Sequence, residues 1–411
     1  MTTRWRRRSF LYPPRDVFPL RYRGLARRAP IVLVLALAAT FFALAASRTS
    51  WLAWLEHWTG DLRTAAFSDR LPSQHKGVAI VAITEETLDI LPYRLPVDRA
   101  FLARLIATID AAGATAIGLD LLFLRPTEPA KDEALIAALK GARARIAIAA
   151  GDTRAELSPA QIAYQDGFIA RAGATPGFAN LLTGGDQIVR YVAPPGEDGK
   201  LALSFAEAVA GKPAERRSYA VRGPLGIPLP VPTSGEPTRI AWLLKPKDGS
   251  DTFPVLPAHV LATPAAAVLG RLLKDRLVIV GTMLPDQDRH LTPLPEWEGA
   301  EVAGVLLQAQ VAAQIADGRS VRHVSEHWLT MLLFSLALPA VIVARRYGVR
   351  TISLFSGGAT AAVLVLDVAV FHFARQVIPF GACLAALALG AAGGVGLDLL
   401  LKLGQRWRSR L

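Results

Sequence analysis

The segment 323–327, HVSEH, has the spacing of a zinc-protease motif. In the H-x-x-E-H pattern, two histidines four positions apart on one helix face bind the metal. The usual third ligand is an acidic residue further along the chain, and the sequence contains no glutamate after Glu326. The segment also borders a long apolar stretch. We therefore interpret it as a chance cluster and expect no metal site.

Other catalytic motifs are missing from the sequence. It has no Walker A loop, no G-x-G-x-x-G segment after a predicted strand and no G-x-S-x-G elbow. Its single cysteine, Cys383, lies in an apolar stretch and excludes an intramolecular disulfide. We expect a protein that is not an enzyme and that needs no cofactor.

Polar residues near the ends of predicted strands are the better candidates for a functional site. In a parallel sheet, ligands bind beyond the carboxyl ends of the strands. This rule points to Thr84, to neighbouring Glu86 and to a tentative ligand-binding set of Glu85, Arg99, Asp120, Arg190, Thr282, Asp288 and His290. A structural role for Asp120, as a turn cap or as the partner of an arginine, stays open beside a role in a pocket.

The elements that would position these residues alternate between strand and helix. Continuous apolar runs predict buried strands at 77–84, 114–123, 145–150 and 277–281, and helical periodicity predicts helices at 97–112 and 131–140. This order is typical of a mostly parallel sheet with flanking helices. Less regular segments predict a hairpin at 177–192, a helix at 201–210, a surface excursion at 211–238, a strand at 239–244 and a helix at 300–316.

Four apolar segments bracket this α/β region. They cover 30–47, 328–344, 351–373 and 377–401. A membrane-spanning helix needs about 17–25 predominantly apolar residues, so each segment predicts a transmembrane helix. A cleaved signal peptide at the first segment would leave three spans.

The distribution of charge predicts the orientation in the membrane. Residues 1–29 carry a net charge of +8, 345–350 carry +3 and 402–411 carry +4, whereas 48–327 carry −2. Short segments rich in Lys and Arg stay in the cytoplasm. We expect 1–29 and the tail 402–411 inside and 48–327 outside the bacterial cytoplasmic membrane. The near-neutral large domain also argues against nucleic-acid binding.

A stripe of small residues marks the last predicted span. Ala386, Gly390, Gly394 and Asp398 recur every four residues, and small residues at this spacing let helices approach closely. The stripe predicts packing either within one chain or in a homodimer, and Lys402 could pair with Asp398. In the third span, Asp367 is expected to meet a polar group of a neighbouring helix, such as His372 of another subunit.

Several of these segments resemble CHASE2, an extracellular sensor domain of bacterial signalling receptors. The resemblance covers most of 50–320, with one span before it and three after it. It is carried by 78–88 (VAIVAITEETL), 95–99 (LPVDR), 116–123 (AIGLDLLF), Asp132, 177–190, 276–281 (RLVIVG), 288–294 (DRHLTPL) and 304–318.

Three positions depart from the family pattern. Thr84 stands where an Asp is usual, 186–189 lacks the usual Asp-Gly before Arg190, and Gln308-Ala309 replaces His-Ala. If these positions bind a ligand in the family, this chain has altered the site.

The resemblance implies a sensor for an unknown stimulus. CHASE2 receptors usually continue into a cytoplasmic kinase or nucleotide cyclase, and 402–411 is too short to hold one. We therefore expect signalling through a separate kinase or cyclase partner. A non-signalling membrane scaffold, or a receptor that has lost its output domain, remains the alternative.

Overall fold

The computed structural model describes residues 29–47, 52–196, 199–213, 237–294 and 301–408. The chain forms two compact units. The sheet unit contains 58–322 with 370–377, and the helical unit contains the segments up to 57, 323–369 and 378 onward. The predicted cytoplasmic segment 1–29 falls outside the described residues except for its last position.

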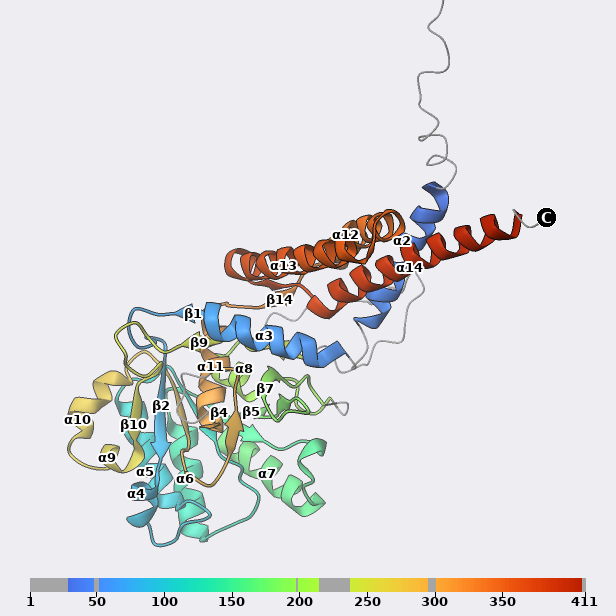
Figure 1. The fold of residues 1–411 in the computed structure, drawn as a ribbon. Helices are drawn as coiled ribbons and strands as arrows, with labels where there is room; N and C mark the ends of the chain where they lie inside the picture. The colour runs from blue at the N-terminus through green and yellow to red at the C-terminus, as the bar shows by residue number, and fades with distance from the viewer. Residues whose placement is uncertain (1–28, 48–51, 197–198, 214–236, 295–300, 409–411) are drawn as a thin grey trace, which may run out of the picture. The chain divides into compact units, whose positions relative to one another are not determined.

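A six-stranded, fully parallel sheet is the centre of the sheet unit (Figure 1). Its strand order is β10-β2-β11-β3-β4-β5. The strands are β2 (Val78–Ile83), β3 (Ala116–Asp120), β4 (Arg145–Ala150), β5 (Thr175–Phe178), β10 (Val255–Pro257) and β11 (Leu277–Thr282). Every residue of β2 is buried, which explains why its sequence is a continuous apolar run. The predicted parallel sheet is confirmed.

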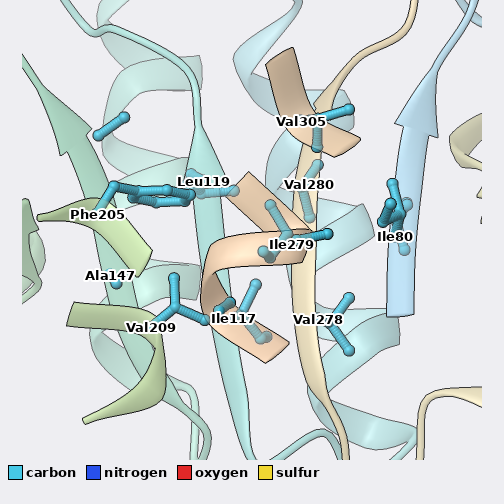
Figure 2. Close-up of a cluster of buried hydrophobic side chains, with 14 of the residues drawn as sticks. Ile80, Ile117, Leu119, Ala147, Phe205, Val209, Val278, Ile279, Val280 and Val305 are labelled. Carbon is cyan, nitrogen blue, oxygen red and sulfur yellow. The ribbon is translucent and has the colours of Figure 1, made fainter. Parts of the chain in front are cut away.

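Helices cover the sheet. Figure 2 shows α8 (Phe205–Ala210) and α11 (Gly304–Ala316) in front of the strands, with the helices of 99–141 behind them. That second group consists of α5 (Arg99–Ala111) and α6 (Pro129–Gly141), and α6 also packs against α7 (Pro159–Ala172). Helix α8 rests directly on the sheet, because a Cβ at Gly118 would lie 2.4 Å from Val209 and one at Gly177 would lie 2.6 Å from the backbone of Phe205.

Short elements complete the sheet unit. The strands β6 (Leu181–Thr183), β7 (Val189–Val192) and β8 (Thr238–Arg239) form an antiparallel sheet, and β12 (Arg289–Leu291) pairs with β13 (Glu301–Ala303). The expected hairpin within 177–192 is therefore present. The expected helix at 300–316 is wrong at its start, because β13 comes first and α11 begins at Gly304. The expected helix at 201–210 begins only at Phe205.

The segment 239–244 is a second correction. It is not one strand: β8 ends at Arg239, and β9 (Leu243–Leu244) pairs with β1 (Asp69–Arg70). Side chains of α11 bond the backbone of Ala241 and Leu243. Gln314 accepts the Ala241 N–H at 2.7 Å, and Gln310 bonds both the N–H and the C=O of Leu243 at 3.0 Å. Most of the expected surface excursion, 214–236, lies outside the described residues.

Among the residues that the structure describes, four helices are long and apolar enough to cross a membrane. They are α2 (Ala29–Ala46), α12 (Glu326–Arg346), α13 (Val349–Ala374) and α14 (Phe380–Arg408). They coincide with the four predicted spans, but α14 continues seven residues past the predicted end at 401. The protein is thus a membrane protein. His323 lies in β14 (Arg322–His323) and His327 in α12, so the idea that both share a helix face is wrong.

The small-residue stripe of α14 packs against α12 of the same chain. A Cβ on Gly390 would lie 2.7 Å from the carbonyl oxygen of Ala337, and one on Gly394 would lie 2.5 Å from that of Val341. Ala386 is fully buried, and Lys402 Nζ lies 2.6 Å from Asp398 Oδ2. The structure therefore shows packing of this stripe within one chain, and its association in a homodimer stays a prediction.

Two carboxylates organise the turn before α14. Asp367 accepts the backbone N–H of Ile378 at 2.9 Å. It therefore has a polar partner within its own chain, and the expected contact with His372 of another subunit stays a prediction. Glu56, from α3 (Ala53–Phe67), accepts the N–H groups of Phe380 and Gly381 at 3.0 and 2.8 Å. These donors belong to the first turn of α14, where backbone N–H groups lack helical partners and favour negative charge.

Candidate functional site

The carboxyl edge of the parallel sheet gathers most of the predicted site residues. Strands β2, β11 and β3 are adjacent, and the register pairs Ile83 with Thr282 and Asp120 with Gly281. Thr282 and Asp120 therefore end neighbouring strands, as the sequence predicted. The N-terminus of α11 packs at the same edge, because a Cβ on Gly281 would lie 2.8 Å from Val305 and 3.2 Å from the Cβ of Asp120.

Asp288 and His290 face the end of β3. The His290 Nε2 lies 2.8 Å from Asp288 Oδ1. Asp288 has a φ of 50°, in the left-handed region that costs energy for a residue with a side chain. Its carboxylate lies over the first residue of α11, since a Cβ on Gly304 would meet Asp288 Oδ2 at 2.2 Å. The positive end of the α11 dipole favours the negative charge there.

Asp120 is the unusual member of this group. Its carboxyl group forms no hydrogen bond or ion pair with any residue that the structure describes. Neither structural role considered for it, turn cap or arginine partner, is therefore present. Burial raises the pKa of Asp120 to about 7, the negative charge of Asp288 adds to this rise, and His290 opposes it. Because this pKa is close to neutral pH, the charge of the Asp120 carboxyl would change in that pH range.

Glu85 joins the same edge but is already paired. It opens α4 (Glu85–Asp89) directly after β2 and forms an ion pair with Arg94, with 2.7 Å between Nη1 and Oε2. Thr84, which stands where the family usually has Asp, caps this helix through a reciprocal capping box with Thr87. Thr84 thus helps to start α4 at the end of β2.

Arg99 lies in the core rather than at the rim. It is 3% exposed, and its guanidinium stacks on Phe123 with 4.2 Å to the ring centroid. Its Nε lies 3.6 Å from Asp132 Oδ1, and that buried nitrogen has no hydrogen-bond partner. Burial lowers the pKa of Arg99, although Asp132 partly compensates.

Arg190, like Arg99, is buried and is not exposed at the sheet edge. It is 3% exposed, and its guanidinium bonds Asp61 of α3 at 2.5 Å and Asp186 of the β6–β7 turn at 2.6 Å. Burial alone would lower the pKa of Arg190, but the two carboxylates raise it, and Arg190 in turn lowers the pKa of Asp186 to about 2. Both partners are occupied, so Arg190 is not a free ligand group.

Sequence reasoning missed a groove beside this edge. The groove has a volume of about 340 Å³ and is lined by Tyr93, Leu95, Pro96, Arg125, Pro126, Thr127 and Glu128. These residues lie in the loop between α4 and α5 and in the loop that follows β3. The strand-end rule stopped at Asp120, and nothing in the spacing of the loop residues marks a pocket.

The raised pKa of Asp120 predicts a pH-dependent stability. Asp120 has a pKa near 3.8 in the unfolded chain and about 7 in the folded chain. Protonation of Asp120 therefore contributes its full stabilisation of the fold below pH 3.8, and this contribution is lost as the pH rises through about 7. Asp120→Asn keeps the neutral form at every pH. We expect its thermal midpoint to match wild type near pH 4 and to exceed it at pH 8. The exposed Asp166→Asn should give the same difference from wild type at both pH values.

A comparison of the sequence with models of protein families identifies a family that covers both the parallel sheet and part of the helical unit. A model of the CHASE2 domain family matches residues 32–343. No curated protein and no solved structure matches the chain. The family match extends from the first candidate span, through the whole parallel sheet, into the second span. Because the match covers well over half of the chain, the protein belongs to the CHASE2 domain family.

Proposed function

We propose that this protein is the extracytoplasmic sensor of a bacterial signalling system. The family match over 32–343, together with four helices able to cross a membrane, is the observation that carries the proposal. The sheet unit would perceive a stimulus at the carboxyl edge of its sheet. The helices would pass the response to a separate partner, a protein kinase or nucleotide cyclase.

The proposed orientation follows from the basic segments. Arg345, Arg346 and Arg350 flank the short connection between α12 and α13, and Lys402 and Arg406 lie near the end of α14. Short basic segments remain in the cytoplasm. We therefore propose that both chain ends lie on the cytoplasmic side of the membrane and that the sheet unit lies on its outer side.

Helix α3 supplies a route for transmission. Its first residues belong to the helical unit and the remainder to the sheet unit. Within the helical unit, Glu56 holds the first turn of α14, and within the sheet unit Asp61 is bound by Arg190. The two carboxylates are five positions apart in one continuous helix. We propose that a change at Asp61 is passed along α3 to Glu56.

Purification of the full chain from its native membranes in mild detergent tests the proposal. A kinase or cyclase should be recovered with it, and Glu56→Gln should change the catalytic rate of that partner without reducing its recovery. Recovery of transport or envelope-assembly proteins alone would contradict signalling and favour the scaffold role.

A further inference from the structure

The groove beside the carboxyl edge has the size and the walls of a small-molecule site. Its 340 Å³ lies at the lower end of the range of about 300–1,000 Å³ typical of ligand pockets. Its apolar lining consists of Tyr93, Leu95, Pro96 and Pro126. Leu95 is 51% exposed, so an apolar surface at the groove is left in water.

Hydrogen bonds hold the groove walls in place. Thr127 donates its backbone N–H and its hydroxyl to Asp132 at 2.9 and 2.7 Å. Glu128 accepts from Tyr93 at 3.2 Å and from Lys131 at 2.7 Å, and Lys131 also binds Asp98 at 2.6 Å. The walls are therefore fixed before any ligand arrives, which reduces the entropy lost on binding.

Arg125 is the polar group of the lining that remains available. Its exposed side chain has no hydrogen bond or ion pair with any residue that the structure describes. The carboxylates around it are already engaged: Glu128 and Asp98 bind Lys131, and Asp132 accepts from Thr127 and faces Arg99.

A second guanidinium lies behind the wall. Arg99 is 3% exposed, its Nε has no hydrogen-bond partner, and its contact with Asp132 is long at 3.6 Å. It interacts electrostatically with two lining residues, Tyr93 and Arg125, and the like charge of Arg125 disfavours its protonated form. An anion in the groove would bind Arg125 directly and offset the repulsion between the two guanidinium groups.

We propose that this groove binds a small organic carboxylate, with its acidic group on Arg125 and its apolar body against Tyr93 and Leu95. The ligand would be amphipathic, because the lining combines apolar and aromatic surfaces with Arg125, which is unpaired among the residues that the structure describes. The role of this ligand as the stimulus rests on the proposed function. Binding itself can be measured without any signalling partner.

The test uses the full chain in lipid nanodiscs and fluorine NMR, with empty nanodiscs as the blank. The probes are 4-fluorobenzoate, the neutral analogue 4-fluorobenzamide, and inorganic phosphate as a competitor. The variants are Arg125→Gln and the control Arg104→Gln, which removes an exposed arginine from α5 outside the groove. A charge-assisted hydrogen bond contributes about 1.5–3 kcal/mol, so Arg125→Gln should weaken 4-fluorobenzoate binding at least tenfold.

Saturable binding of 4-fluorobenzoate that Arg125→Gln weakens and Arg104→Gln preserves would support the proposal. Equal binding of the benzamide would overturn the role of the charge, and full displacement by equimolar phosphate would overturn the role of the apolar body. No saturable binding, or binding unaffected by Arg125→Gln, would overturn the site itself. A partner kinase or cyclase recovered in that case would leave the sensor proposal intact, so the two failures can be told apart.

Discussion

Replacing Gln310 by leucine should lower the thermal unfolding midpoint of the full chain by roughly 4–24 °C. Gln310 is fully buried and bonds both the N–H and the C=O of Leu243. Each buried backbone group left unbonded costs about 1–3 kcal/mol, and 1 kcal/mol corresponds to about 2–4 °C in a domain of this size. Loss of near-UV circular dichroism on heating, in detergent micelles, measures the midpoint.

A matched control separates this effect from a general consequence of replacing glutamine by leucine. Gln405 is exposed near the end of α14, so Gln405→Leu should leave the midpoint of the sheet unit unchanged. A midpoint for Gln310→Leu within 2 °C of wild type would show that α11 does not hold the Leu243 backbone.

Gly394→Leu should separate α14 from α12 and destabilise the helical unit. The new side chain would begin 2.5 Å from the Val341 carbonyl oxygen and 2.9 Å from the Ala344 Cβ. Backbone cannot withdraw as a flexible side chain would, so we expect a cost of about 3 kcal/mol, the upper end of typical overpacking. The mole fraction of SDS that unfolds the helices in mixed micelles measures it.

Gly396 provides the control for this substitution. It lies two positions further along α14, and a Cβ there meets nothing within 4 Å. Gly396→Leu should unfold at the wild-type SDS fraction. If both leucine variants behave alike, the contact between Gly394 and Val341 does not hold the two helices together.

The parts of the fold that were predictable depend on local sequence signals. Strands β2 and β11 are buried on both faces, so their sequences are apolar runs that need no knowledge of their neighbours. Helix α7 was missed although its signals are present: Ser158 and Gln161 form a capping box, and Gly173 ends the helix in the left-handed conformation.

Non-local contacts explain the errors. The segment 239–244 reads as one strand, but its two ends pair with different strands, β7 and β1. Gln314 and Gln310 of a distant helix bind the backbone at Ala241 and Leu243. The strand-end rule placed Asp120 and Thr282 at the sheet edge. It could not tell that Arg99 turns into the core between α5 and Phe123, or that Asp61 and Asp186 occupy Arg190. These outcomes depend on which helix packs beside each residue, which spacing along the chain does not encode.

The side of the membrane on which the sheet unit lies tests the central claim most directly. Single cysteines can report it, since the native Cys383 is buried. Lys247→Cys lies in an exposed turn of the sheet unit, and Gln405→Cys lies near the end of α14. In intact spheroplasts, a membrane-impermeant maleimide should label Lys247→Cys and not Gln405→Cys, and permeabilised cells should label both. Labelling of Gln405→Cys in intact spheroplasts, or protection of Lys247→Cys, would contradict an extracytoplasmic sensor.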